Sequence, residues 1–222
     1  MNVVDAVRNR YSVRAYLDKP VDKEMVYKLL DIARFSPSGH NTQPWELFVL
    51  MGKTKEHVSK KLIDAVISKV ERRYDYDYGY KEVPDFIKER RDACNVKVFK
   101  HKNINPKTDK DKLKEHILEN FRCFGAPVCI LIARDKHLGE EAFIDIGLFA
   151  QTLMLVALEF GLATCPQTSI VAYAELLHKE LNIPNDKIIT MSLTLGYPDE
   201  NAHINKLRMD RDAVDKFTKF YT

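Results

Sequence analysis

The sequence has few of the residues that build metal centres and disulfide frameworks. Its 222 residues include 4 cysteines and 7 histidines. No two cysteines form a Cys-x-x-Cys pair, and neither His-x-x-x-His nor His-Glu-x-x-His occurs. The sequence therefore predicts no metal site and no redox dithiol. We expect reduced, mostly buried thiols, which are typical of a cytosolic protein.

Long apolar runs are also lacking. No uninterrupted run approaches the roughly 18 residues of a membrane-spanning helix. The richest stretch, residues 144–158, is interrupted by Asp145, Gln151 and Thr152. The first residues lack the basic-then-apolar order of a secretory signal. We therefore expect a cytoplasmic protein with no membrane contact.

The charge is not one-sided. Lys+Arg total 35 and Asp+Glu total 32, which gives a net charge of +3 and does not favour nucleic-acid binding. The chain has no Gly-x-Ser-x-Gly, P-loop or Gly-x-Gly-x-x-Gly motif, so hydrolase, NTPase and dinucleotide-fold interpretations have no support. Hydrophobic residues make up 45% of the chain, enough for a packed core.

What the sequence does contain is a loose alternation of helices and strands. This pattern predicts one α+β or α/β domain over residues 1–222. Strands are expected at 46–51, 128–133 and 188–195. Helices are expected after Asn2, after Asp22, and at about 54–73, 140–160 and 171–181, with Gly161 ending the 140–160 helix. The end of the chain, 211–222, is expected to be a short helix or an arm.

Residues 71–115 differ from the rest in composition. Tyr74, Tyr76, Tyr78 and Tyr80 alternate with Asp and Gly, and a lysine-rich stretch of low hydrophobicity follows. The segment is longer than an ordinary connection, and long loops are often functional. We interpret it as an excursion from the core that serves as a lid. A solvated surface insertion is the alternative.

Two basic segments lie near opposite ends of the chain. Arg10, Ser12 and Arg14 are two residues apart, so in an extended chain they share one face. Two guanidiniums and a hydroxyl on one face can hold a phosphate. Lys206, Arg208 and Arg211 could complete such a site. Each segment taken alone is more often a solvated basic face.

Two further segments combine small and polar residues. Residues 36–45, Ser-Pro-Ser-Gly-His-Asn-Thr-Gln-Pro-Trp, lie between a predicted helix and a predicted strand. They can present backbone N–H groups and short side chains to a polar ligand. Residues 161–169, Gly-Leu-Ala-Thr-Cys-Pro-Gln-Thr-Ser, follow the most apolar helix, and we expect a turn there that Pro166 fixes. Plain connections remain the alternative for both.

The order of these segments resembles the FMN-dependent nitroreductase family. Residues 10–16 look like its Arg-x-Ser-x-Arg-x-aromatic opening, and residues 36–45 are similar to its second motif almost residue for residue. Residues 145–155 and 161–167 resemble its central helix and the segment after it. Residues 205–211 look like its basic C-terminal motif. The resemblance covers about residues 1–55 and 120–217, and 71–115 matches no named motif.

The resemblance implies a three-layer α+β fold, with a central mixed sheet flanked by helices. It also implies an intertwined homodimer with two FMN sites at the subunit interface. The implied enzyme is an FMN-dependent oxidoreductase. Electrons would pass from NADH or NADPH through flavin N5 to a nitroaromatic, quinone or related acceptor, in ping-pong order. A flavin-binding carrier or sensor without turnover, a reductive dehalogenase of the same family with a lid at 74–82, and a non-flavin interaction protein remain alternatives.

Individual roles also follow from the resemblance. Arg10 and Ser12, with Arg211 or else Arg208, would hold the FMN phosphate. Arg14 would lie near the pyrimidine edge of the flavin, where a guanidinium stabilises the reduced, anionic ring, and a Thr168 donor would lie near N5. No catalytic acid, base, nucleophile or metal is required. The full implied cofactor-binding set is Arg10, Tyr11, Ser12, Arg14, Pro37, Ser38, Gly39, Asn41, Pro166, Gln167, Thr168, Arg208 and Arg211, with Pro37, Ser38 and Asn41 reaching the flavin of the partner subunit.

Overall fold

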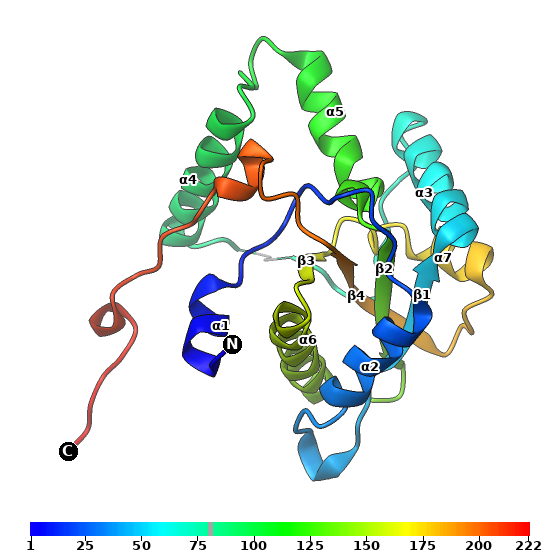
Figure 1. The fold of residues 1–222 in the computed structure, drawn as a ribbon, viewed down its shortest axis with the longest axis vertical. Coiled ribbons are helices and arrows are strands. Elements are labelled where there is room, and N and C mark those ends of the chain that lie inside the picture. Colours follow the sequence, from blue (N-terminus) through cyan, green and yellow to red (C-terminus); the bar gives the residue numbers. More distant parts are fainter. Residues whose placement is uncertain (80–81) are drawn as a thin grey trace.

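The computed structural model describes residues 1–79 and 82–222 (Figure 1). Its central sheet has four strands in the order β1-β2-β4-β3. These are β1 (Glu46–Met51), β2 (Val128–Asp135), β3 (Ala163–Gln167) and β4 (Lys187–Gly196). The strands predicted at 46–51, 128–133 and 188–195 are confirmed to within two residues at either end.

The expectation of a mixed sheet needs correction for this chain. All three ladders between the described strands are antiparallel. The reason is that β4 lies between β2 and β3 and runs opposite to both, while β1 runs opposite to β2. The one parallel pairing among the described residues is an isolated bridge between Arg73 and Tyr173.

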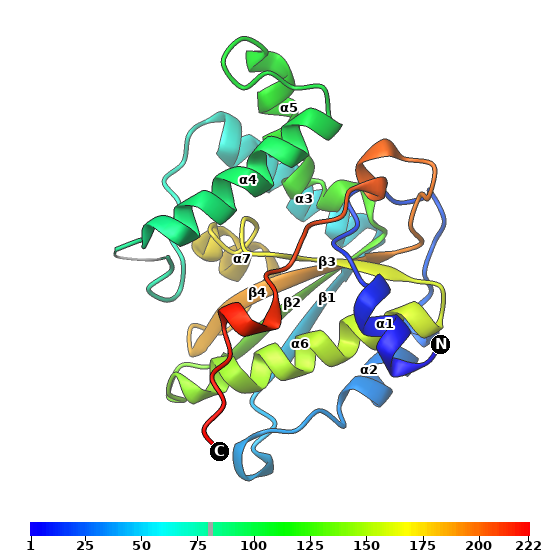
Figure 2. The ribbon, with the colours of Figure 1, turned by 90° about the vertical axis from the view of Figure 1, so that its left-hand side faces the viewer.

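Helices cover both faces of the sheet (Figure 2). Alternate residues of β2 face opposite sides, as a strand requires. Val128, Ile130 and Ile132 pack with α2 (Lys23–Ala33) and α6 (Glu141–Glu159). Cys129 and Leu131 pack with α3 (Gly52–Ile67) and α7 (Ala174–Leu181). The chain therefore has the expected three layers and α+β class.

Helix starts follow the predicted caps where a polar side chain supplies one. Asn2 caps α1 (Val3–Asn9), and the Asp22 carboxylate accepts a hydrogen bond from the Met25 N–H at the start of α2 (2.7 Å). The predicted bounds of two other helices were wrong. α3 begins directly after β1 and stops before Lys69, whose positive φ ends the helix. α7 begins only at Ala174, because Tyr173 is held in the bridge to Arg73.

The segment predicted to turn at Pro166 instead forms β3. The turn occurs earlier, at Gly161, whose φ is +67°. Pro166 has no N–H to donate. It lies in β3, the edge strand of the described sheet, and pairs with Leu193 of the neighbouring β4. An edge position tolerates proline because one side of the strand needs no ladder.

The 71–115 excursion contains two helices, α4 (Asp85–His101) and α5 (Lys110–Phe121). Only Val98 of α4 is buried, and the helix stands away from the sheet (Figure 2). α5 runs back to the body and buries Leu118 and Phe121. The first turn of α4 carries the acidic Asp85, and the last turn carries the basic Lys100 and His101. This arrangement interacts favourably with the helix dipole. The low hydrophobicity of the segment thus reflects a helix with little buried surface.

α6 is apolar all round, as its sequence indicates, yet one side of it is uncovered in this chain. Leu153 and Ala157 are fully buried, whereas Ile144 is 68% and Leu148 is 42% exposed. α6 is the one described helix long and apolar enough to cross a membrane, and core helices pass the same test. After a single turn at η3 (His203–Lys206), the chain from 207 onward runs along the surface. Apart from one turn at η4 (Val214–Lys216), it leaves the body as an arm (Figure 1).

Candidate functional site

The two basic segments predicted to bind phosphate meet beside β3. The Val13 N–H donates to the Thr164 carbonyl (3.1 Å), which aligns the N-terminal segment with the edge strand. The Arg14 N–H donates to the buried Asn205 side chain (2.9 Å). The same side chain donates to the carbonyls of Ala15 (2.7 Å) and Asp199 (2.8 Å). Asn205, which the sequence motifs did not single out, therefore joins the two ends of the chain.

Arg10 and Arg211, called the cationic pair below, lie close enough at this junction for the charge of Arg211 to act on Arg10. Burial and the nearby charge of Arg211 lower the pKa of the Arg10 guanidinium below its ordinary value. In the part of the chain that the structure describes, neither guanidinium pairs with a carboxylate. Arg211 donates instead to the carbonyls of Met209 (3.0 Å) and Asp210 (2.9 Å). Two nearby guanidiniums that form no ion pair with a carboxylate among the described residues suit a phosphate dianion, which Arg binds through charge-assisted hydrogen bonds.

The geometry distinguishes between the C-terminal candidates. The Arg208 guanidinium lies 3.6 Å from the centre of the Tyr11 ring and donates to the carbonyls of Asn205 (2.7 Å) and Leu207 (2.9 Å). Its position is thus fixed by stacking and by local backbone contacts. Arg211 is the residue whose charge acts on Arg10.

A buried thiol lies under the cationic pair. Burial raises the pKa of Cys165, and the neighbouring Arg14, Ser12 and Arg10 act in the opposite direction. The thiol therefore stays protonated at neutral pH and packs as a small apolar side chain. The Arg14 guanidinium also donates to the Ser12 carbonyl (3.3 Å), so a hydrogen bond within the opening motif holds the Arg14 side chain.

The far end of β3 carries Pro166, Gln167 and Thr168. The Gln167 amide nitrogen donates to the Asn120 carbonyl (3.1 Å), and its oxygen is a buried atom without a partner among the described residues. The Thr168 hydroxyl shares a hydrogen bond with the Tyr78 hydroxyl (2.8 Å). The hydroxyl of Thr168 is therefore held in place by the tyrosine segment. Only the tertiary structure reveals this contact.

The tyrosines of the excursion form an aromatic cluster against the body. Tyr74 stacks on Tyr78 with ring centres 4.2 Å apart, and Tyr76 contacts Phe143 of α6 at 5.1 Å. The Tyr76 hydroxyl donates to the Thr190 carbonyl (2.7 Å). Burial and the neighbouring tyrosines raise the pKa of Tyr76 to about 12, so it remains a donor. Tyr80 and Lys81, also predicted for the lid, lie outside the described residues, and Glu82 is exposed.

The loop at 36–45 lies elsewhere. The Gly39 N–H contacts both oxygens of Asp145 in α6 (3.2 and 3.3 Å), and the Ser38 hydroxyl accepts from the Gln43 N–H (3.0 Å). The first residue of the chain instead reaches Glu159, 14 residues further along α6. That separation corresponds to about 21 Å of helix. The 36–45 loop, which carries Pro37, Ser38, Gly39 and Asn41, therefore lies apart from the N-terminal segment within one chain (Figure 1). Among the described residues, no hydrogen bond or ion pair joins it to Arg10, Ser12 or Arg211.

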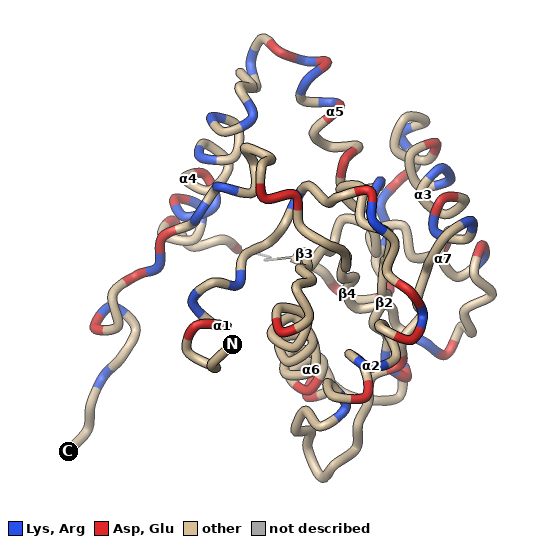
Figure 3. Tube along the Cα trace, in the orientation of Figure 1, with Lys and Arg blue, Asp and Glu red and all other residues tan. Residues whose placement is uncertain are grey.

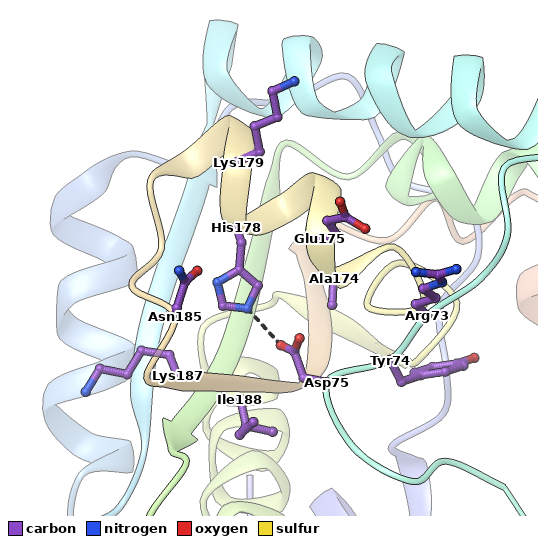
Figure 4. A pocket seen from close by; sticks show the side chains of 10 residues that line it. All are labelled: Arg73, Tyr74, Asp75, Ala174, Glu175, His178, Lys179, Asn185, Lys187 and Ile188. Atoms are coloured by element: carbon purple, nitrogen blue, oxygen red, sulfur yellow. Dashed lines mark hydrogen bonds and ion pairs between the residues drawn. The ribbon is translucent and has the colours of Figure 1, made fainter.

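A cavity of about 490 Å³ lies away from these motifs, at the base of the tyrosine segment (Figure 4). On its wall, His178 Nε2 lies 2.9 Å from the Asp75 carboxylate, and Nδ1 lies 3.0 Å from the Ile183 carbonyl. The same carboxylate oxygen accepts from the Ile189 N–H (2.8 Å). Because both ring nitrogens face acceptors, this geometry favours the doubly protonated imidazolium. The pair fastens residues 74–78 to α7 and β4.

The pKa of His178 is raised by this arrangement. Burial acts against the charged ring, but the hydrogen bonds to the Ile183 carbonyl and to Asp75 outweigh it. The remaining charged lining of the cavity is Arg73, Glu175, Lys179 and Lys187. Lys187 is paired with Glu46 and Asp135, and Arg73 with Glu71.

The three-layer α+β fold described above is consistent with one known class of proteins, and the comparison with family models identifies it. A model of the nitroreductase family matches residues 7–197. The chain belongs to the nitroreductase family, and the predicted family, α+β class and oxidoreductase class are confirmed.

Particular relatives place it more narrowly. The chain is 35% identical to the 4-nitrobenzoate reductase of Pseudomonas putida, over 96% of this chain and 93% of that protein. It is 31% identical to the chloronitrobenzene nitroreductase of Comamonas testosteroni, over 97% and 95%. Its fold is similar to the FMN and NADPH-dependent nitroreductase NfnB of Sphigopyxis sp. strain HMH, with a TM-score of 0.95, 29% identity and full coverage of both chains.

We predict that the Asp75–His178 pair makes stability depend on pH. The folded-state pKa of His178 lies above its ordinary value of 6.5. Its contribution is therefore complete below that value and is lost as the pH rises through the folded-state pKa. Replacing His178→Gln should lower the free energy of unfolding by about 1–2 kcal/mol at low pH and by less at high pH. Urea unfolding of both proteins between about pH 6 and pH 9 measures this.

The matched control is His57→Gln. His57 also pairs with a carboxylate of α7, Glu180, at 2.6 Å, but its side chain is 53% exposed. This substitution should change stability by less than about 0.5 kcal/mol. A His178→Gln deficit that stays constant across the pH range would contradict the assignment of a charged ring.

Proposed function

We propose that this protein is an FMN-dependent oxidoreductase that passes electrons from NADPH or NADH to nitroaromatic compounds in ping-pong order. The observation that carries the proposal is the cationic pair of Arg10 and Arg211, which lacks a carboxylate partner among the described residues. Similarity to a 4-nitrobenzoate reductase supports a nitroaromatic acceptor. Similarity to NfnB of Mycobacterium smegmatis, solved in complex with NADPH (TM-score 0.93, 26% identity), supports NADPH as the donor.

The residues on hand suit these roles. Arg10, Ser12 and Arg211 would hold the FMN phosphate, and Arg14 would lie toward the pyrimidine edge of the ring. The Tyr78 hydroxyl can donate to Thr168, which leaves the Thr168 hydroxyl free to donate toward N5. Bound FMN would supply the electron transfer itself, and the protein would orient it and limit access of water.

We further propose an intertwined homodimer in the cytoplasm. The partner's 36–45 loop would complete a site that this chain holds only in part. Large apolar side chains are exposed on α1, on α6 and along the C-terminal arm, as expected of surfaces that a second copy covers. They are Val3, Val4, Val7, Ile144, Leu148, Phe217, Phe220 and Tyr221. Residues 71–115, within a domain spanning 1–222, would cover the substrate side.

An anaerobic absorbance experiment tests the proposed activity. We expect the FMN-loaded protein to lose its oxidised flavin absorbance when NADPH or NADH is added, and to regain it with 4-nitrobenzoate. Bleaching by neither nucleotide would favour a carrier or sensor. Failure to bind added FMN at all would favour an interaction protein and overturn the proposal.

Removal of either member of the cationic pair should weaken FMN binding. Each charge-assisted hydrogen bond is worth about 1.5–3 kcal/mol, so Arg10→Ala and Arg211→Ala should each raise the Kd for FMN about 10- to 100-fold. Titration by quenching of flavin fluorescence measures the Kd. Arg208→Ala is the control and should have a smaller effect, because its guanidinium is already engaged with Tyr11 and backbone carbonyls. A larger effect at Arg208 than at Arg211 would reverse the assignment.

Hybrid dimers test whether the site is shared between subunits. One chain would carry Arg10→Ala and the other Asn41→Asp, a change that keeps a residue tolerant of the positive φ at this position. If each site takes Arg10 from one chain and Asn41 from the other, the hybrid has one intact and one doubly altered site. We expect one FMN per hybrid dimer bound with native affinity. If both residues came from one chain, no site with native affinity would remain.

A further inference from the structure

The helix α4 buries little surface, and two of its contacts with the C-terminal segment are ion pairs. Only Val98 of its 17 residues is buried. Arg90 and Lys97, seven residues apart on one face, form ion pairs with Asp212 and Asp210 of the C-terminal segment. Figure 3 shows basic and acidic residues meeting where the arm passes α4. Lys97 lowers the pKa of the Asp210 carboxyl, as expected for a direct ion pair.

The two carboxylates flank the proposed phosphate-binding residue. Residues 207–213 form neither helix nor strand. Asp210 and Asp212 reach α4, and Arg211 between them lies close enough to Arg10 to lower its pKa. Two residues of the segment are thus tied to α4, and the charge of the residue between them acts on Arg10.

Mutual repulsion makes this position costly for Arg211. Arg211 is exposed, its guanidinium donates to the backbone carbonyls of Met209 and Asp210, and Arg10 repels it. Without a restraint, a long cationic side chain next to another cation would move toward solvent. The Asp210–Lys97 and Asp212–Arg90 ion pairs on either side of Arg211 supply a restraint.

We propose that Asp210 and Asp212 are positioning residues for the FMN phosphate. Through Lys97 and Arg90 of α4, they hold the 209–212 segment so that Arg211 stays beside Arg10 before the phosphate arrives. This inference rests on the proposed phosphate site. By reciprocity, phosphate binding at Arg211 steadies α4, so the cofactor and the excursion are coupled.

The direction in which one double substitution changes the affinity for FMN separates this positioning role from a simple effect of charge. Changing both carboxylates, Asp210→Asn and Asp212→Asn, makes the site more positive, so charge alone predicts tighter binding of an anion. Loss of positioning predicts weaker binding. Two exposed ion pairs of ordinary strength correspond to a rise in Kd of about 5-fold. We expect that rise, measured by flavin fluorescence quenching on the full-length protein.

The matched control lies on the same helix. Asp85 pairs with Lys88 at 3.0 Å, both side chains being at least half exposed, and neither reaches the C-terminal segment. Asp85→Asn should leave the Kd within about 2-fold. High salt should raise the Kd of every variant, because it screens the phosphate contact. It should do so more steeply for the wild type, because it also breaks the two positioning pairs.

Hydrogen exchange of α4 provides a readout independent of activity. FMN should slow exchange of the amides at 85–101 in the wild type, and this protection should be lost in the Asp210→Asn, Asp212→Asn protein. Circular dichroism checks that the variants are folded. Unchanged or tighter FMN binding by the double variant would overturn the inference. If Arg211→Ala also binds FMN normally, the phosphate assignment itself fails; if only Arg211→Ala weakens binding, the positioning role alone fails.

Discussion

The hydrogen bonds of one buried amide hold the proposed site together. Asn205 accepts from the Arg14 N–H and donates to the carbonyls of Ala15 and Asp199. The bonds with Arg14 and Ala15 join segments 191 and 190 residues apart in the chain, and a buried amide left without partners would be costly. Because the N-terminal motif is fixed to the C-terminal segment in this way, Arg10 and Arg211 come together beside β3. The stacking of Arg208 on Tyr11 and the hydrogen bond from the Asp199 N–H to the Ala15 carbonyl (3.1 Å) join the same two segments.

The chemistry of the proposed site depends on the charges of Arg10 and Arg211 and on the position of the Thr168 hydroxyl. A pair of repelling guanidiniums is stabilised by an anion, and the most direct occupant is a phosphate. The opposite end of β3 offers Thr168, held by the Tyr78 hydroxyl. Tyr78 in turn stacks on Tyr74, next to Asp75, whose pair with His178 fixes the tyrosine segment to the body. The side chains at both ends of β3 are thus held in position by contacts with segments that are distant in the sequence.

The uncovered face of α6 explains a feature of the sequence. A helix that is apolar all round needs burial on every side, yet the sheet and α2 cover only part of it. Ile144 and Leu148 are left exposed, close to Asp145, which holds the 36–45 loop. A second copy covering this face would bury both side chains and bring that loop to a neighbouring site. The proposed dimer would therefore bury the exposed apolar face of α6 and also complete the cofactor site.

Much of the fold and of the candidate site was readable from the sequence. The strands at 46–51, 128–133 and 188–195, the caps at Asn2 and Asp22, and the stop at Gly161 depend on neighbouring residues alone, so local patterns predict them. The ordered motifs identified the family. Two features could not be read locally: the edge strand through Pro166 and the helix α4 with its small buried surface. The ranking of Arg211 before Arg208 as the phosphate ligand stays a prediction.

The reason lies in the range of the interactions. Hydrophobic periodicity, caps and turn residues act over a few positions, and they determined the elements and the residue types of the site. Whether Pro166 lies on an edge, whether Arg208 stacks on Tyr11, and which cation faces Arg10 depend on segments brought together from opposite ends of the chain. Tertiary structure alone decided these, because burial and Coulomb interactions depend on distance in space and not on distance along the sequence.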